Sequence, residues 1–110
     1  MNRKSFIAGA DLTDKIGYAV KPADGKIVLA SVAGEACFGV LMNDNVADRA
    51  VGVALTGDVC KAKAGGAVAM GALLATDANG KLVTAGENAK VVAMALEAGV
   101  ANDLIYVVVK

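Results

Sequence analysis

The sequence contains no histidine and no tryptophan, and it has only two cysteines and one proline. Histidine is the usual general base and a frequent metal ligand, so its absence argues against acid–base catalysis and against most zinc sites. The carboxylates fall at predicted turns or strand ends, where aspartate is favoured for its local backbone hydrogen bonds. We therefore predict a protein that is not an enzyme and that uses no metal and no cofactor.

An excess of charge of one sign is also missing. Eleven basic and eleven acidic residues give a formal net charge of zero, and neither sign forms a run. Nucleic-acid binding normally requires a basic patch that displaces counterions from phosphates. Arg3-Lys4 and the pair Lys61 and Lys63 come nearest to such a patch, and the second pair fits a solvated strand face. We expect no nucleic-acid partner.

The longest apolar stretch is too short to cross a bilayer. It covers 12 residues, from Ala64 to Ala75, whereas a membrane span requires about 20 residues. Near the start of the chain, Gly9 and Asp11 interrupt the apolar run that a secretory signal needs. We therefore expect that the protein does not associate with a membrane and that it is made in the cytoplasm. In that compartment, Cys37 and Cys60 are predicted to be reduced, buried thiols rather than one disulfide.

The hydrophobic residues that are present are mostly small. They make up 56% of the 110 residues, yet the chain has only two phenylalanines and two tyrosines. Small side chains remove less apolar surface from water, so a single domain of this size gains stability from further burial. This composition favours an oligomer, or a subunit that docks on something larger.

Short apolar segments separated by glycine turns predict a mainly β fold. The clearest turns are Pro22–Gly25 and Asp77–Gly80, where Asp-Gly and Asn-Gly suit the positive φ angles of hairpins. The segment from Val68 to Gly71 is predicted to be a tight turn before a strand that starts at Leu73, with a single helical turn as the alternative. The other expected strands are Ile16–Lys21, Lys26–Ala30, Cys37–Leu41, Val51–Leu55, Val59–Lys63, Lys81–Val83, Val91–Leu96 and Leu104–Val109.

The first 14 residues differ from the rest because they show neither helical nor strand periodicity. We predict an extended N-terminal arm over residues 1–14 and a single β domain over residues 15–110. The arm is either a frayed terminus or a segment that becomes ordered on a partner. In the second case Phe6 and Ile7 are its apolar anchors.

The last predicted strand is apolar on both faces. In a small β domain, such a strand lies centrally or lines a subunit interface. Leu104, Tyr106, Val107 and Val108 are therefore the predicted interface residues, and we expect a cyclic homo-oligomer, a trimer.

The order of these segments resembles that of the head-decoration, or capsid cement, proteins of tailed bacteriophages. The resemblance covers roughly Phe38 to Val109 and rests on turns and short strands. It implies a small β barrel or β-tulip-like body that assembles as trimers on the outside of the capsid. The segments that carry it are Val51–Val59, Lys61–Leu74, Asp77–Val83 and Ala95–Gly99, followed by Ile105–Val109.

The resemblance also implies a partner and a site. The partner would be the major capsid protein, and the site would be the arm, with Arg3 and Lys4 facing acidic patches and Phe6 and Ile7 making apolar contacts. The protein would be made in the host cytoplasm and would stabilise the virion from the capsid exterior. The competing interpretation is a non-viral small β carrier or ligand-binding module. A carrier holds its modified lysine in the hairpin turn, whereas Lys81 follows the turn.

Overall fold

All regular structure in residues 3–110, the part of the chain that the computed structural model describes, is β-strand. No helix in this part is long and apolar enough to cross a membrane. The strands are β1 (Arg3–Ile7), β2 (Ala19–Ala23), β3 (Lys26–Leu29), β4 (Gly39–Leu41), β5 (Ala50–Ala54), β6 (Val59–Lys63), β7 (Leu73–Thr76), β8 (Leu82–Thr84), β9 (Ala93–Ala95) and β10 (Leu104–Val109).

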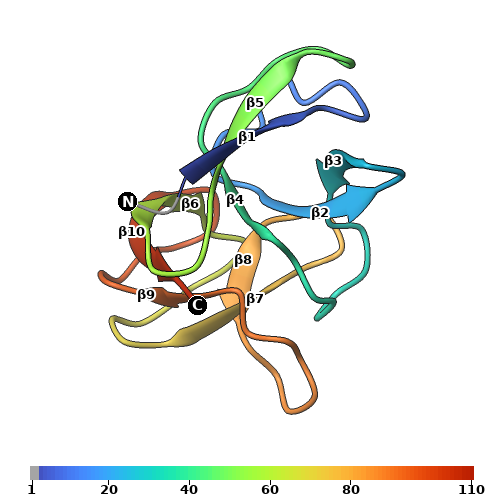
Figure 1. Cartoon of the computed structure of the whole chain (residues 1–110). Coiled ribbons are helices and arrows are strands. Elements are labelled where there is room, and N and C mark those ends of the chain that lie inside the picture. The colour runs from blue at the N-terminus through green and yellow to red at the C-terminus, as the bar shows by residue number, and fades with distance from the viewer. Residues whose placement is uncertain (1–2) are drawn as a thin grey trace.

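The strands form two antiparallel five-stranded sheets, one from each half of the chain (Figure 1). The strand order is β1-β5-β4-β2-β3 in the first sheet and β6-β10-β9-β7-β8 in the second. The prediction of a mainly β, single-domain fold is confirmed. The sheets are not closed into a barrel, because β1 and β3 remain the edges of the first sheet and β6 and β8 those of the second.

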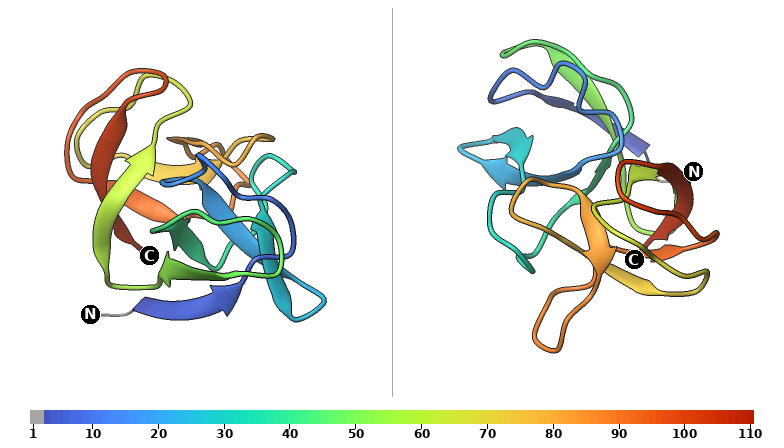
Figure 2. Two further views of the ribbon diagram at one scale, coloured as in Figure 1. Left: turned by 90° about the horizontal axis from the view of Figure 1, so that it is seen from above. Right: turned by 180° about the vertical axis from the view of Figure 1, so that it is seen from behind.

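The two sheets have the same topology. Adding five to each strand number of the first sheet gives the strand order of the second sheet. The chain is therefore an internal repeat of one β unit, which the sequence analysis did not predict. We refer to residues 3–55 as the first unit and to residues 59–109 as the second unit (Figure 2).

Equivalent loops in the two units make equivalent hydrogen bonds. The backbone N–H of Leu12 donates to the carbonyl oxygen of Asn45 at 2.9 Å, and the N–H of Val68 donates to that of Gly99 at 2.9 Å. In each unit this hydrogen bond joins the loop after the unit's first strand to the loop before its last strand. The repeat therefore extends beyond the strands to the connections between them.

The sequence carries a trace of the same repeat in the hairpins. The segment Asp24–Ala30 reads DGKIVLA, and Asn79–Ala85 reads NGKLVTA. The first hairpin turns at Asp24 and Gly25, with φ angles of 51° and 78°, as a two-residue turn between antiparallel strands requires. Pro22 lies within β2 and pairs with Ile27, so the predicted Pro22–Gly25 turn is two residues too long at its start.

The second hairpin confirms its prediction. Strand β7 pairs with β8 across the Asn79-Gly80 turn, and Gly80 has a φ of 85°. Strand β7 begins at Leu73, as expected, after a turn at Gly71 with a φ of 85°. The alternative of a helical turn before Leu73 is wrong, because Met70 and Gly71 adopt a hydrogen-bonded turn instead.

The core consists of two clusters that divide unequally between the units. One lies within the first unit and contains Ala8, Leu12, Val20, Ile27, Leu41, Val51 and Val53. The other joins the second unit to the opposite face of the first sheet. It contains Ala19, Ala30, Val40 and Ala54 from the first unit and Cys60, Ala62, Ala64, Val68, Leu74, Leu82, Val92, Ala93, Ala95, Ile105, Val107 and Val109 from the second. The first sheet is therefore buried on both faces.

The N-terminal segment belongs to the β body. Strand β1 pairs with β5 along its whole length, from Arg3 opposite Ala54 to Ile7 opposite Ala50. Ala8 is fully buried in the core of the first unit. The prediction that this segment lacks strand structure is wrong, because pairing and burial outweigh its weak periodicity. Met1 and Asn2, also part of the predicted arm, lie outside the described residues.

Candidate functional surface

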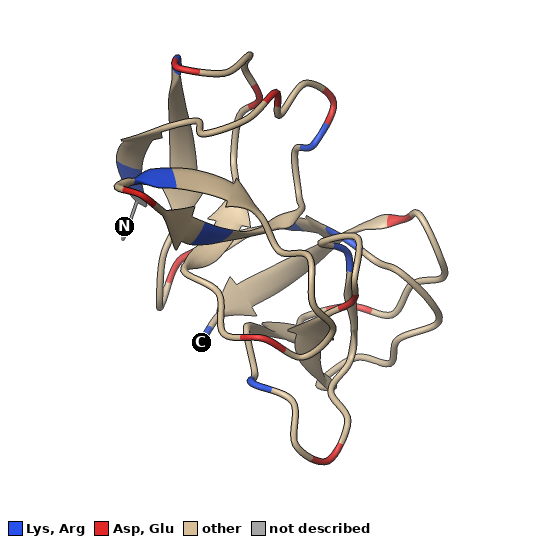
Figure 3. Cartoon of the chain, turned by 90° about the vertical axis from the view of Figure 1, so that its right-hand side faces the viewer, with Lys and Arg blue, Asp and Glu red and all other residues tan. Residues whose placement is uncertain are grey.

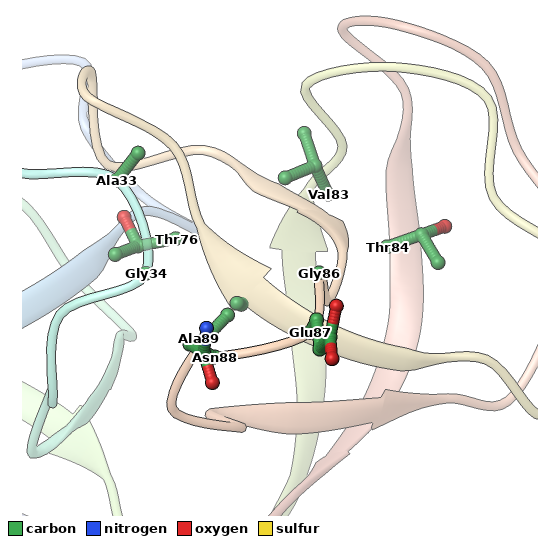
Figure 4. A pocket seen from close by; sticks show the side chains of 10 residues that line it. Ala33, Gly34, Thr76, Val83, Thr84, Gly86, Glu87, Asn88 and Ala89 are labelled. Atoms are coloured by element: carbon green, nitrogen blue, oxygen red, sulfur yellow. The ribbon is translucent and has the colours of Figure 1, made fainter.

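One hollow of about 370 Å³ lies between the units, but its chemistry is sparse. It is lined mainly by small side chains, and it includes one carboxylate, Glu87 (Figure 4). Within residues 3–110, no three histidine, cysteine, aspartate or glutamate side chains are close enough together to hold a metal ion. The lining residues are Ala33, Gly34, Ala75, Thr76, Val83, Thr84, Gly86, Glu87, Asn88 and Ala89.

A cluster of polar groups around Glu35 holds the β3–β4 loop in place. The Glu35 carboxylate accepts hydrogen bonds from the backbone N–H groups of Ser31 at 2.7 Å and Val32 at 2.8 Å. Lys21 Nζ lies 3.0 Å from Glu35 Oε1. Burial opposes ionisation of this carboxyl group, but the hydrogen bonds and the lysine charge prevail and lower its pKa. Every oxygen of Glu35 is thus engaged in holding the loop.

The two cysteines are free thiols, as predicted, and neither has the setting of a nucleophile. Burial, together with the nearby negative charge of Glu35, raises the pKa of Cys37 to about 11. A thiol with such a pKa is protonated at neutral pH and is a poor nucleophile. Cys60 is buried in the core cluster shared by the two units. Both residues act as small apolar side chains.

Positions of both charge signs are scattered along the strands and loops, as the colours on the ribbon in Figure 3 show. Lys61 is exposed on β6, and its Nζ lies 4.9 Å from the centre of the Tyr106 ring on β10. Such a contact stabilises the pair by about 0.5–1 kcal/mol when it is exposed. This geometry fits a solvated strand face.

The predicted arm residues lie on strand β1, at the edge of the first sheet. Lys4 is exposed, and its Nζ lies 5.8 Å from the centre of the Phe6 ring. Phe6 is half-buried against Phe38, with the ring centres 5.7 Å apart. Successive residues of a strand point to opposite faces, so Ile7, which is exposed, faces away from Phe6. The structure therefore does not bring the two predicted apolar anchors together on one face. Arg3 contributes its backbone to the pairing with β5.

The predicted interface residues on β10 also divide between two faces. Leu104 and Tyr106 are exposed by 44% and 48%, and Val108 is half-buried on the same side. Val107 faces the other way and is fully buried in the core of the chain itself. A second copy could therefore touch the first three residues and could not reach Val107.

An apolar row that the sequence analysis missed crosses the outer face of the second sheet. Val59 pairs with Val108, Val108 with Met94, and Met94 with Leu73. Val59 and Leu73 are exposed by 47% and 48%, and the two between them are half-buried. We call these four residues the outer row. A shallow hollow of about 300 Å³ beside it is lined by Ile16, Leu41, Met42, Val59, Cys60, Lys61 and Tyr106.

Sequence alone gives little sign of this row. The four residues lie on four strands, and only the register between strands brings them into line. The alternation Val59-Cys60-Lys61-Ala62 does show which residues of β6 point outward, and that part is confirmed. The row therefore brings four apolar side chains, two of them exposed, to the outer face of this sheet.

No protein-family model matches the sequence, and no curated protein matches it. Among solved structures, the chain is similar to the N base of the head fiber gp8.5 of bacteriophage phi29, with a TM-score of 0.70. The two sequences are 17% identical, and the match covers 98% of this chain and 92% of the other. The likeness establishes a shared fold over almost the whole chain, both units included.

Proposed function

We propose that this chain is a structural protein of a tailed-bacteriophage virion that binds the outside of the capsid and stabilises the shell. The observation that carries the proposal is the fold shared with the base of a phage head fiber over 98% of the chain. The resemblance of the turn pattern to capsid decoration proteins supports the same role independently of that match. The partner in this role is the major capsid protein.

The physical chemistry of the surface is consistent with that role. A protein that binds the assembled shell and not its dissociated subunits stabilises the shell by mass action. Many copies that each bind weakly produce a large total effect. Such a protein requires a stiff body and a contact surface, and the two-unit β body supplies the first with the shared core cluster.

The proposed capsid contacts are Arg3, Lys4, Phe6 and Ile7, now as residues of an edge strand. Lys4 is exposed beside the Phe6 ring, so a cation and an aromatic surface are presented together. Because β1 is already paired with β5, binding would not require a free arm to become ordered, which would cost about 1–2 kcal/mol per residue. We also propose that the protein acts as a homo-oligomer, a trimer, with the exposed side of β10 at its interface.

Co-sedimentation with mature capsids that lack this protein tests the proposal. We expect the wild type to pellet with the capsids and to raise the temperature at which the shells break. Lys4→Glu should weaken binding by about tenfold, the effect of about 1.4 kcal/mol. Lys90→Glu makes the same charge change at an exposed site in the second unit and should bind as the wild type does. Failure of the wild type to bind would overturn the proposal.

The carrier or ligand-binding alternative has less support from the geometry. Lys81 lies after the hairpin turn, and its Nζ donates a hydrogen bond to Asn102 Oδ1 at 2.8 Å. A lysine held against the body in this way is poorly placed as a swinging attachment point. The hollow beside Glu87 offers few polar groups for recognition of a small ligand.

A further inference from the structure

The contact between the two units has a direction. It is made by one surface of the second unit, called the inserting end, and a different surface of the first unit, called the receiving face. The inserting end consists of the β7–β8 turn, which carries Gly80, and the end of β6 at Lys63. The receiving face consists of Gly17, Ala19 and the residues beside them on the same face of the first sheet.

The inserting end makes the hydrogen bonds Ala19 N–H to Gly80 O at 2.7 Å and Lys63 N–H to Gly17 O at 2.8 Å. Beside it, Gly34 of the first unit donates its N–H to Thr76 O and accepts a hydrogen bond from Lys90 N–H, both at 2.9 Å. Such a contact is heterologous, because it joins two different surfaces. The first unit therefore keeps an unused inserting end, and the second unit keeps an unused receiving face.

Two pairs of equivalent glycines show the unused surfaces. On the receiving face, Gly17 is buried, and a Cβ there would meet the backbone nitrogen of Lys63 at 2.9 Å. Its equivalent in the second unit, Gly71, has the same positive φ but is exposed, with nothing within 4 Å of a Cβ. The second unit therefore has a receiving face that is left uncovered by residues 3–110.

The inserting ends show the opposite pattern. Gly80 is buried, and a Cβ there would lie 3.3 Å from the Tyr18 ring and 3.4 Å from the carbonyl oxygen of Ala19. Its equivalent, Gly25, is exposed and has nothing within 4 Å. The β2–β3 turn that carries Gly25 projects away from the second unit in every view of Figures 1 and 2. The first unit therefore has an unused inserting end.

The side chains of the two receiving faces fit the same interpretation. In the first unit three of the four positions of the outer row are taken by Ala19, Val40 and Ala54, which are fully buried under the second unit. In the second unit the same positions hold Leu73, Met94 and Val108. These larger apolar side chains remain half-buried or exposed in the single chain. Covering them removes apolar surface from water and is favourable.

We propose that the Gly25 turn of one copy docks on the receiving face around Gly71 and Leu73 of a second copy. The contact repeats between chains the one that Gly80 makes with Gly17 and Ala19 within the chain. Ile7, the equivalent of Lys63, then lies at this contact, which leaves Arg3, Lys4 and Phe6 for a capsid. This inference goes beyond the proposed function and holds whether or not the chain binds a capsid.

Two substitutions block the two sides of the contact separately. Gly25→Asn adds a side chain where the folded chain has open space, and asparagine tolerates the positive φ of 78°. Leu73→Asp places a charge on the receiving face at a side chain that is 48% exposed in the single chain. We expect each variant to keep its thermal unfolding midpoint within a few degrees and to weaken self-association by about 100-fold or more, because docking would crowd or desolvate the new group.

Sedimentation of the free protein over a concentration series provides the measurement. The wild type should assemble, each variant alone should be monomeric, and an equimolar mixture should form a one-to-one complex. In that complex the intact Gly25 turn of the Leu73→Asp chain occupies the intact receiving face of the Gly25→Asn chain. Gly86→Asn, at another open glycine, and Val46→Asp, at another exposed valine, are matched controls that should assemble as the wild type does.

Three results would overturn the inference. They are a monomeric wild type, a Gly25→Asn variant that assembles normally, and a mixture of the two monomeric variants that forms no complex. The second result would point to a symmetric contact of one outer row with another. None of them bears on capsid binding, which is measured separately by co-sedimentation.

Discussion

The first and second units share one topology but differ in how their sheets are covered. The sheet of the first unit has a core on each face, one of its own and one shared with the second unit. The sheet of the second unit has a core on one face and the outer row on the other. Because the strand topology is the same in both units, the difference comes from position in the chain. The first unit has the second unit on that face, whereas the second unit has no neighbour there among residues 3–110.

The same comparison separates residues that maintain the unit from residues that connect units. Val53 and Val107 occupy equivalent places in β5 and β10, the strands next to one edge of each sheet, and both are fully buried. Such positions require an apolar side chain in either unit. Ala19 and Leu73 are also equivalent, yet one is buried and small and the other is larger and exposed. At the positions of Ala19 and Leu73, the size of the side chain therefore depends on whether another unit covers it.

The largest expected effect comes from removing the outermost strand of the first unit. Deletion of residues 1–8 removes one of the two strands that pair with β5, together with the half-buried Phe6 and the fully buried Ala8. We expect the free energy of unfolding in urea to fall by about 2–5 kcal/mol, from lost apolar burial and lost backbone pairing. An N-terminal segment that was only an arm would leave stability unchanged after the same deletion.

A point variant in the same strand provides the control for the deletion. Lys4→Ala removes only an exposed side chain and keeps the strand. Its free energy of unfolding should stay within about 0.5 kcal/mol of the wild type, as for most surface substitutions. A loss as large as that of the deletion would mean that the side chain of Lys4, and not the pairing of β1, holds this edge.

A smaller effect is expected from substitutions at the two equivalent hairpin glycines. Gly25→Ala and Gly80→Ala both place a Cβ at a positive φ, which costs about 1–2 kcal/mol. Only at Gly80 would the Cβ also crowd the Tyr18 ring and the backbone of Ala19. We therefore expect Gly80→Ala to lower the free energy of unfolding by about 1 kcal/mol more than Gly25→Ala. Equal losses in urea denaturation would contradict a contact between units that depends on close backbone approach.

The fold was predictable from the sequence as far as local signals reach. The turn at Gly80 and the strands that flank it follow from Asn-Gly between apolar residues, and the start of β7 at Leu73 follows from Gly71. The alternation in β6 correctly places Cys60 inside and Lys61 outside. Chain-length and composition arguments support a single β domain, and the structure has one.

What the sequence did not reveal depends on pairing between distant segments. Strand β1 was missed because its order comes from β5, almost fifty residues later in the chain. The internal repeat was missed although DGKIVLA and NGKLVTA are present, because elsewhere the units share inward-facing positions and not identical residues. The outer row exists only through the register of four strands. The resemblance to capsid decoration proteins, and the trimer it implies, stay predictions.

The smallest expected effect concerns a feature that the first unit has and the second lacks. Glu35 joins the β3–β4 loop to Lys21, whereas the corresponding position near residue 90 carries a lysine. The pKa of Glu35 is lowered in the folded state, so its ionised form stabilises the fold at pH values above its ordinary pKa of 4.5. That contribution is lost as the pH falls through the lowered folded-state value.

Replacing Glu35 with glutamine therefore has a pH-dependent consequence. At neutral pH, Glu35→Gln should lower the free energy of unfolding by about 1 kcal/mol, because charge-assisted hydrogen bonds become neutral ones. Below the folded-state pKa the wild-type side chain is itself neutral, so urea midpoints of the two proteins should converge. Glu87→Gln, in the exposed loop of the second unit, should cost less at neutral pH. If the gap between Glu35→Gln and the wild type were the same at both pH values, the ionised carboxylate would not be what holds this loop, and the difference between the two units would lie in backbone packing alone.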